Sequence, residues 1–146
     1  MRIGKRVCAL LFALLACLGA AGCAQHSQDA AGQDWRTTGL VQASGTITRD
    51  GDDISVLVCV HADSASIYYD ISPQTLFASV EYPVSLPGDP GEAFRSIDFA
   101  DRNGDGCGDV AMLFGSDTLM VWYWDGASGA YVYQPEESQI PDSART

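Results

Sequence analysis

Basic residues are scarce in this 146-residue sequence. Its one lysine is Lys5, and after position 22 the permanent cations are the arginines Arg36, Arg49, Arg95, Arg102 and Arg145. All 19 acidic residues also follow position 22, so residues 23–146 carry a net charge of −14. Such a surface repels phosphate backbones, which argues against nucleic acid as a partner. It suits cations or basic proteins, although acidity also simply keeps a secreted protein soluble.

Side chains typical of catalytic sites are scarce too. The two histidines are His26, in a polar stretch, and His61, near the end of an apolar segment. The sequence contains no Gly-x-Ser-x-Gly pattern, and no spacing pairs two of its carboxylates as a general acid and base. We therefore expect a protein that is not an enzyme.

Long apolar runs are limited to one, Val7–Leu18. It follows the basic residues Arg2, Lys5 and Arg6 and precedes a group of small residues. This order of a basic, an apolar and a small-residue region is typical of a secretory signal. The run has about a dozen residues, whereas a membrane span needs about 20. We expect residues 1–22 to be a signal peptide with a helical apolar region.

The end of this signal, Ala20–Cys23, resembles the lipobox of bacterial lipoproteins. In that family the cysteine thiol carries a lipid with fatty-acid chains such as palmitate and becomes the mature N-terminus. The resemblance implies that Cys23 anchors the protein to the membrane outside the cytoplasm. Ala24, in place of aspartate, favours the outer membrane in a host that has one. Leu14–Cys17 also fits a lipobox, but cleavage there would leave a very short apolar region. The alternative to a lipoprotein signal is an ordinary signal peptide that merely contains a cysteine.

The remaining chain divides into a tether and one domain. Residues 23–34 are small and polar, which predicts a flexible tether, and the folded domain is expected over residues 35–146. Two cysteines remain there, Cys59 and Cys107. They could form one disulfide outside the cytoplasm, or one could be a buried thiol and the other a loop thiol.

The domain is predicted to be all-β, a compact antiparallel sandwich or a partial propeller. Short apolar runs alternate with turn residues, and no long segment has helical spacing. Asp50-Gly51 indicates a hairpin turn, and Pro83 indicates an edge strand or the end of a strand. Pro87–Glu92 is expected to be a loop, and the polar tail after Pro135 is expected to fray. The expected strands are Gly39–Arg49, Ile54–Val60, Ser66–Ile71, Leu76–Leu86, Ala93–Phe99, Asp109–Phe114, Thr118–Asp125 and Ala130–Gln134. In the fourth of these, one face is expected to be buried, with Leu76, Ala78, Val80, Tyr82 and Val84.

The strand expected at Thr118–Asp125 is apolar on both faces. Leu119, Val121 and Tyr123 alternate with Met120, Trp122 and Trp124, which predicts a central strand covered on both sides. The alternative is that the two tryptophans form a platform for sugars, but aromatic residues inside a strand more often belong to the core.

The most informative stretch is the acidic loop at 101–109. Side-chain oxygens recur at its first, third, fifth and ninth positions, in Asp101, Asn103, Asp105 and Asp109. Calcium takes six to eight oxygen ligands, and the backbone carbonyl of Cys107 can supply one more. The flanks read as strands and position 12 is Met112, which excludes an EF-hand. A simple Asn-Gly and Asp-Gly hairpin turn is the alternative.

This stretch resembles the Asp-x-Asn-x-Asp-Gly-x-x-Asp loop of FG-GAP and VCBS repeats, which occur in β-propellers and in bacterial surface proteins. The resemblance covers about residues 97–133. It implies bound Ca²⁺, with ligands from Asp101, Asn103, Asp105, the Cys107 carbonyl and Asp109. Cys107 departs from the residue type common at its position, but that position binds through the backbone. The chain is too short for a full propeller, so we expect one solitary module.

Ser128-Gly129-Ala130-Tyr131 matches the Ser-Gly-x-Tyr motif of some periplasmic lysozyme inhibitors. The match makes Ser128, Gly129 and Tyr131 candidates for partner contacts, although the first interpretation of this segment is a β-turn. Together these features predict a lipid-anchored, calcium-stabilised, non-catalytic module that binds a protein or glycan ligand. The alternative is an inhibitor or immunity protein that acts against a lysozyme-like cell-wall hydrolase.

Overall fold

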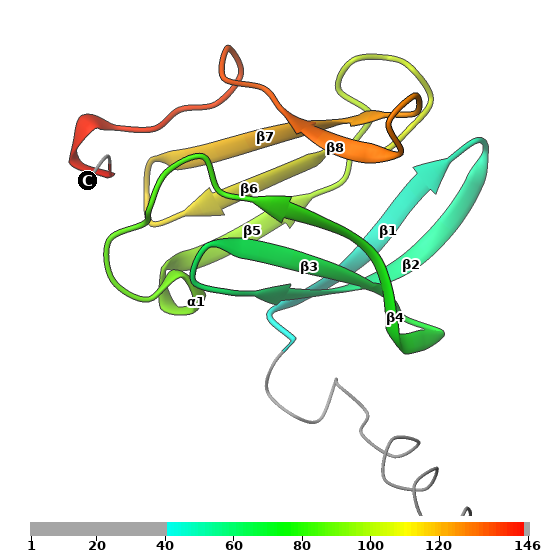
Figure 1. The fold of residues 1–146 in the computed structure, drawn as a ribbon, viewed down its shortest axis with the longest axis horizontal. Coiled ribbons are helices and arrows are strands. Elements are labelled where there is room, and N and C mark those ends of the chain that lie inside the picture. Colours follow the sequence, from blue (N-terminus) through cyan, green and yellow to red (C-terminus); the bar gives the residue numbers. More distant parts are fainter. Residues whose placement is uncertain (1–40, 145–146) are drawn as a thin grey trace, which may run out of the picture. The chain divides into compact units, whose positions relative to one another are not determined.

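A computed structural model describes residues 41–144 of the chain, which form two antiparallel sheets of four strands each (Figure 1). The first sheet contains, in order, β1 (Ala43–Arg49), β2 (Asp52–Val60), β3 (Ser64–Tyr69) and β4 (Ser72–Glu81). The second contains β5 (Phe94–Asp98), β6 (Val110–Phe114), β7 (Thr118–Asp125) and β8 (Ala130–Tyr133). The all-β prediction is confirmed.

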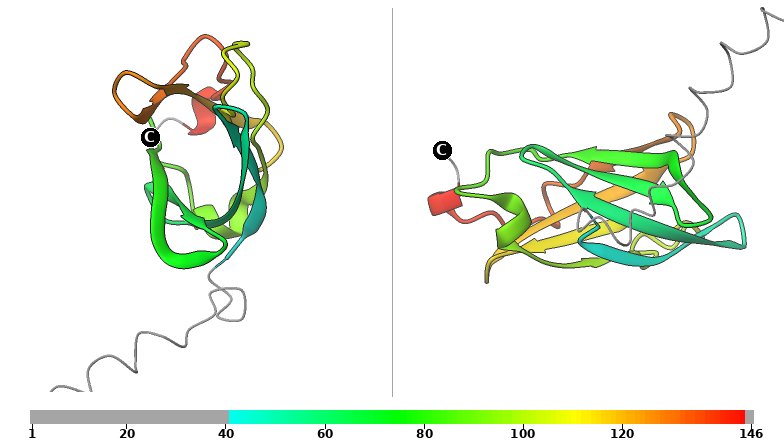
Figure 2. Two further views of the ribbon diagram at one scale, coloured as in Figure 1. Left: turned by 90° about the vertical axis from the view of Figure 1, so that its right-hand side faces the viewer. Right: turned by 90° about the horizontal axis from the view of Figure 1, so that it is seen from below.

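The two sheets share one core. Its fully buried side chains come from both: Ile47, Val56, Val58, Ala65, Ile67 and Val80 from the first sheet, and Val110, Met112, Phe114, Met120 and Trp122 from the second. Every second residue of a strand faces inward, because successive side chains point to opposite faces. At the two sides of the structure β1 lies beside β5 and β4 beside β8 (Figure 2). Two sheets that face each other over a common core make this domain a sandwich.

The hairpin between β1 and β2 turns where the sequence predicts. Asp50 has a φ of 53° and Gly51 a φ of 86°. Positive φ at both central residues is the geometry of a type I′ turn, whose twist matches that of paired strands. The turn brings Arg49 opposite Asp52 and sets the register of the whole hairpin.

The prediction for β4 is partly wrong. The strand runs over Ser72–Glu81, and Leu76, which we expected in the core, is 51% exposed. The pairing of β3 with β4 explains the difference, because its register shifts on either side of Tyr68. Such a bulge inserts an extra residue and reverses the faces on one side of it, so Phe77 packs against the core instead.

Two further segments differ from the prediction. The expected loop at Pro87–Glu92 contains a one-turn helix, α1 (Pro90–Ala93), whose N-cap Asp89 accepts a hydrogen bond from the Gly91 N–H at 2.8 Å. Proline in the first turn suits a helix start because it has no N–H to leave unpaired.

The segment after Pro135 does not fray. Since β8 is short, it leaves the first half of β7 unpaired, and Gln139 exchanges two backbone hydrogen bonds of 2.8 Å with Leu119 there. The tail ends in a short 3-10 helix, η1 (Asp142–Ala144). β7 therefore lies in the interior of its sheet, as predicted, but it is not fully covered on both faces: Val121 is buried, whereas Leu119 and Tyr123 on the outer face are half-buried.

Candidate functional site

The acidic loop joins β5 to β6 at one end of the sandwich. Residues 101–106 are exposed, Cys107 is half-buried, and Gly108 and Asp109 are buried. The loop curls back on itself at Gly104 and Gly106, which have φ angles of 79° and 86°. Residues with a Cβ rarely adopt this left-handed conformation, so the two glycines make the curl possible.

Asp101 organises the exposed part of the loop. One of its carboxylate oxygens accepts the N–H groups of Gly104 (2.7 Å) and Asp105 (3.2 Å), and the other accepts the N–H of Gly106 (2.9 Å). The hydrogen bond from Gly106 is the main cause of a lowered pKa of Asp101, and those from Gly104 and Asp105 add to it. The carboxylate is therefore held ionised with its oxygens turned toward the loop backbone.

Asn103 and Asp105 contact each other directly. The Asn103 Nδ2 donates to Asp105 Oδ2 at 3.0 Å, and Asn103 Oδ1 accepts the Asp105 N–H at 2.9 Å. The other oxygen of Asp105 accepts the N–H of Cys107 at 2.8 Å. A neutral amide at position 103 therefore donates to Asp105, where a carboxylate would repel it.

Asp109 differs from the other carboxylates because it is 0% exposed. One oxygen accepts the N–H of Trp124 on β7 at 3.0 Å, and the other accepts the N–H of Arg102 at 2.8 Å. A buried carboxylate is tolerated only where hydrogen bonds replace its hydration. Asp109 therefore ties the first turn of the loop to the second sheet.

Gly108 fixes the loop to the first sheet. Its N–H donates to the carbonyl of Thr48 at 2.7 Å. A Cβ at this position would lie 2.7 Å from the Phe99 carbonyl oxygen and 3.1 Å from Cγ2 of Ile47. The loop approaches β1 so closely that only glycine fits.

Tyr131 and Arg49 complete this attachment. The Tyr131 hydroxyl donates to the Gly108 carbonyl (3.2 Å) and accepts from the Arg49 guanidinium (3.2 Å). That guanidinium lies over the Trp124 ring, 3.3 Å from its centre, and 4.7 Å from the centre of the Phe77 ring. Burial raises the pKa of Tyr131 to about 12, so its hydroxyl keeps its proton. The sequence gives no sign of these contacts, since Arg49 and Tyr131 are 82 positions apart.

The donor chemistry of the loop fits calcium, which prefers carboxylate, amide and carbonyl oxygens. Asp101, Asn103 and Asp105 present such oxygens on the exposed side, and each carboxylate oxygen has lone pairs beyond those used in the hydrogen bonds above. Within residues 41–144, however, no three acidic, histidine or cysteine side chains are arranged as a metal-holding group. The structure brings Asn103 and Asp105 together and turns Asp109 inward.

Ser128 and Gly129 lie in the exposed turn between β7 and β8. Asp125 closes this turn by accepting the N–H groups of Ala127 (3.0 Å) and Ser128 (3.2 Å). A further hydrogen bond from the Ser128 side chain is the first cause of the lowered pKa of Asp125. Tyr131 points away from the turn toward Gly108, so the three residues of the motif do not form one surface.

The aromatic side chains of β7 do not form a sugar platform. Trp122 is only 2% exposed, packs in the core and meets Tyr133 edge-on. Trp124 is covered by the guanidinium of Arg49. The prediction that these residues belong to the interior is confirmed for Trp122, and the platform alternative is wrong.

The two described cysteines are both free thiols. Gly108, next to Cys107, is bonded to Thr48, which pairs with Asp53 on β2. Cys59 lies six residues farther along that strand, a separation of about 20 Å at about 3.3 Å per residue. A disulfide needs Cα atoms within about 7 Å, so this fold does not allow one. Burial raises the pKa of Cys59.

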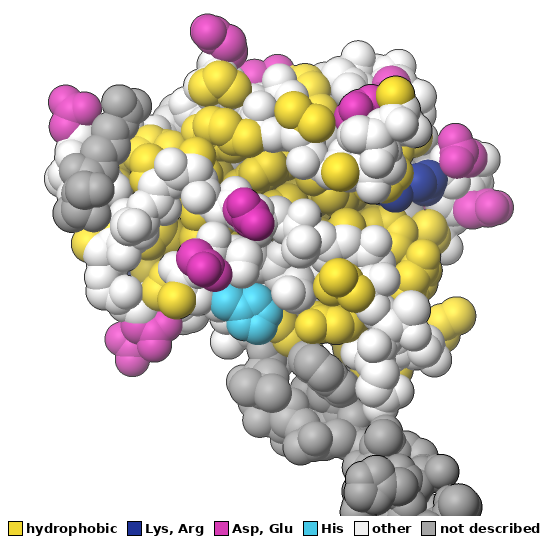
Figure 3. All heavy atoms as spheres, in the orientation of Figure 1, with side chains coloured by type: hydrophobic (Ala, Val, Ile, Leu, Met, Phe, Trp, Pro, Cys, Tyr) yellow, Lys and Arg dark blue, Asp and Glu magenta, His cyan; other side chains and the backbone are white. Residues whose placement is uncertain are grey.

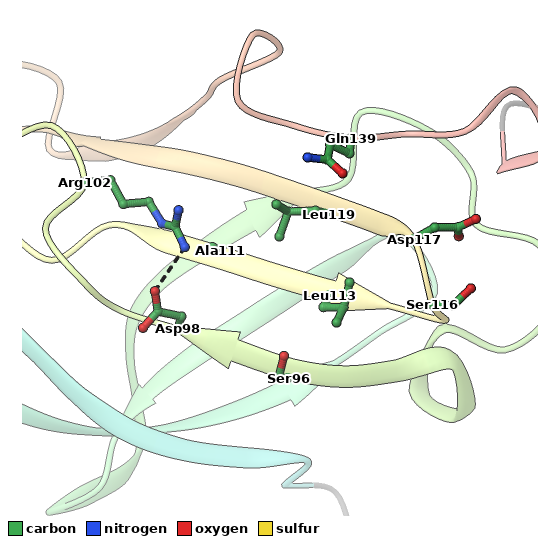
Figure 4. Close-up of a pocket in the computed structure, with 9 residues that line it drawn as sticks. All are labelled: Ser96, Asp98, Arg102, Ala111, Leu113, Ser116, Asp117, Leu119 and Gln139. Atoms are coloured by element: carbon green, nitrogen blue, oxygen red, sulfur yellow. Dashed lines mark hydrogen bonds and ion pairs between the residues drawn. The ribbon is translucent and has the colours of Figure 1, made fainter.

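A shallow hollow of about 310 Å³ lies on the outer face of the second sheet (Figure 4). Ala111, Leu113 and Leu119 form its apolar floor. At one end Asp98 and Arg102 form an ion pair of 3.1 Å. Both partners are partly exposed, so the pair contributes little to stability, but it orients the first turn of the loop.

The remaining predictions concern residues outside the described range or have little structural context. Residues 1–22, Cys23, the tether at 23–34 and His26 lie outside residues 41–144. His61 is exposed and shares a hydrogen bond of 3.1 Å with the Ser66 hydroxyl.

In the described part of the chain, no helix has the length and apolar character needed to cross a bilayer. No known protein family, curated protein or solved structure matches the sequence.

Proposed function

We propose that this chain is a lipid-anchored protein of the cell envelope whose β-sandwich is a non-catalytic binding module for a protein or glycan ligand. Calcium at loop 101–109 stabilises that module. The observation that carries the proposal is the attachment of this oxygen-rich loop to both sheets, through Gly108 to β1 and through Asp109 to β7. A ligand that orders such a loop stabilises the elements on both sides of it.

Asp101, Asn103, Asp105 and the Cys107 carbonyl would hold the ion, while Asp109, the further ligand that the resemblance implies, is buried and would support the loop through its hydrogen bonds to Arg102 and Trp124. Bound calcium would supply charge neutralisation among three carboxylates within nine residues of chain. An ion that binds only the folded state stabilises by about 2.7 kcal/mol at a hundredfold excess over Kd. Extracellular calcium modules have Kd values of roughly 10⁻⁴–10⁻³ M, so millimolar calcium outside the cell would occupy the site.

The test is thermal unfolding of the full chain in a nonionic detergent, with calcium, magnesium or chelator at equal ionic strength. We expect calcium to raise the melting temperature. Magnesium should raise it less, because it demands compact octahedral geometry. Asp105→Ala should abolish the response, while Asp52→Ala, an exposed acid in the β1–β2 hairpin, should retain it. An unchanged melting curve in chelator, with no calcium heat in calorimetry, would leave the loop as a turn only.

The anchor is tested separately by labelling cells with radioactive fatty acid. The wild-type protein should take up label and Cys23→Ala should not. Equal labelling of the two proteins, or no labelling of the wild type, would refute lipidation at Cys23.

An inhibitor or immunity protein against a lysozyme-like hydrolase is the second candidate. It is supported by charge, because residues 41–144 contain 17 acidic residues and three arginines and such hydrolases are commonly basic. The exposed turn with Ser128 and Gly129 offers a contact surface that reaches outside the sandwich. A pull-down and inhibition assay over a panel of lysozymes would support this candidate if one enzyme is both bound and inhibited. The candidate would be rejected if every lysozyme of the panel stays fully active when this protein is present at a saturating concentration.

A further inference from the structure

A groove of about 400 Å³ runs between β4 and β8, where the two sheets meet at one side of the sandwich. Its walls include Glu81 at the end of β4, Tyr82 directly after that strand, and Trp122, Tyr131 and Tyr133 from the second sheet. Figure 3 views this side and shows hydrophobic side chains gathered along the junction of the sheets, with acidic side chains beside them. Ser79 and Pro83 complete the lining, so the groove combines aromatic residues, of which Trp122 is almost fully buried, with polar surface and the carboxylate of Glu81.

The strands that border the groove are each the last in their sheet. In the described structure no backbone pairing joins β4 to β8. Each of these two strands therefore has one unpaired edge, which borders the groove. The unpaired N–H and C=O groups of an edge strand are a template for an added extended segment. The groove thus offers backbone partners as well as aromatic surface.

The charges of the domain select a cationic occupant. Residues 41–144 have a net charge of −14, and none of their three arginines lines the groove. Arg49 is stacked on Trp124 and donates to the Tyr131 hydroxyl from outside the groove lining, and Arg102 is paired with Asp98. Tyrosine ring faces attract ammonium and guanidinium groups, and Glu81 supplies an opposite charge. A second copy of this acidic chain would be repelled, and a neutral glycan would gain nothing from the charge.

One polar atom in the groove wall lacks a partner. The Tyr82 hydroxyl is buried and makes no hydrogen bond with any described residue. Its ring packs edge-on against Phe114, with the ring centres 5.2 Å apart. A buried hydroxyl without a partner is a cost to the free protein and is uncommon in native structures. A donor from a bound cation would satisfy it.

We propose that the β4–β8 groove binds an extended, arginine- or lysine-bearing segment of a basic protein. A cationic side chain lies among the tyrosine rings and pairs with Glu81, and its N–H groups donate to the Tyr82 hydroxyl. This inference rests on the proposed role as a binding module and specifies the chemistry of the partner.

The test uses the full chain in detergent and a capped peptide of alternating arginine and threonine. A second peptide with citrulline in place of arginine has the same shape without the charge. We expect the arginine peptide to bind and the citrulline peptide to bind far more weakly. Glu81→Gln should weaken binding about three- to fivefold, the upper part of the range of one exposed charge pair. Glu136→Gln removes the same charge from an exposed site outside the groove and should change binding less than twofold.

Tyr82→Phe provides a second measurement. It should weaken peptide binding about fivefold while leaving the fold intact, because it deletes only an unpartnered hydroxyl. Equal weakening by Glu81→Gln and Glu136→Gln, or equal binding of the citrulline peptide, would overturn the groove as a cation site. Binding of an N-acetylglucosamine oligomer that displaces the peptide and is indifferent to Glu81→Gln would indicate a glycan site instead. The calcium response, recorded on the same samples, shows separately whether the proposed function fails.

Discussion

Asp105 and Asp109 belong to one loop but lie in different surroundings. Asp105 is exposed, and its partners are other groups of the loop. Asp109 is 0% exposed, and its two oxygens accept backbone N–H groups of Arg102 and Trp124. The first side chain is available to an ion without disturbing the core, whereas the second is already part of the core. Their roles can be separated by the same substitution at both positions.

We expect Asp109→Asn to destabilise the protein by about 1–3 kcal/mol in the presence of chelator. The new amide offers one oxygen where the carboxylate offers two, so one of the two buried N–H groups loses its acceptor. Asp105→Asn should stay within about 0.5 kcal/mol of the wild type, because its exposed contacts tolerate an amide. Urea unfolding measures both differences. Equal effects of the two substitutions would contradict the assignment of Asp109 as a structural carboxylate.

Asn103→Asp separates the calcium interpretation from a simple turn. Without calcium it replaces the amide that donates to Asp105 with a second carboxylate near 3.0 Å, which should lower the melting temperature. With calcium the added charge becomes another hard ligand, so the shift on calcium addition should exceed that of the wild type. If the loop is only a turn, the variant stays destabilised in both conditions. Asn103→Ala serves as the control that adds no charge.

At the scale of strands and turns, local patterns in the sequence were reliable. The apolar run at Thr118–Asp125 coincides with β7, and Asp50-Gly51 forms the expected turn. The prediction was wrong at Leu76, because the bulge beside Tyr68 depends on how two strands pair and not on the residues of one strand. The order of the tail was also missed, since it depends on β8 being too short to cover β7.

In the candidate site, too, the local structure could be predicted from the sequence and the long-range contacts could not. The spacing of Asp101, Asn103 and Asp105 correctly indicated a tightly curled, oxygen-rich loop. The attachment of the loop could not be read from the sequence, because the hydrogen bond from Tyr131 to Gly108 spans 23 positions and the one from Arg49 to Tyr131 spans 82. Contacts of this kind depend on the packing of the two sheets.

The close approach of loop and β1 makes Gly108 a sensitive position. Gly108→Ala would place a Cβ 2.7 Å from the backbone oxygen of Phe99, so either the loop or β1 must move. We expect a loss of about 2 kcal/mol or more, in line with other steric changes in a packed core, and a smaller calcium response. Gly126→Ala is the matched control, since its nearest neighbour would be Trp124 Nε1 at 3.8 Å. Thermal melting of both variants, with and without calcium, tests whether this contact couples the loop to the first sheet.

At the scale of the whole domain, charge is the dominant feature. Residues 41–144 have 17 acidic residues and three arginines, one of which, Arg102, forms an ion pair with Asp98. Three acids (Asp50, Asp52 and Asp53) follow Arg49 directly, and two more (Asp101 and Asp105) lie in the loop attached to that hairpin. Like charges packed this closely repel in the folded state more than in an expanded chain. The same repulsion favours a basic partner and disfavours self-association.

This repulsion predicts how stability depends on monovalent salt. Raising sodium chloride from about 0.01 M to 0.15 M shortens the Debye length from about 30 Å to about 8 Å, which screens exposed acids from one another. Screening also weakens the Asp98–Arg102 pair, but an exposed pair contributes about 1 kcal/mol at most, so relief of repulsion should prevail. In chelator we therefore expect the melting temperature to rise, by about 4–8 °C for each kcal/mol gained in a domain of this size. A melting temperature that is flat or falls with salt would show that the net charge does not limit stability. Calcium at matched ionic strength should add a further rise that Asp105→Ala removes and Asp52→Ala retains, which separates binding at the loop from general screening.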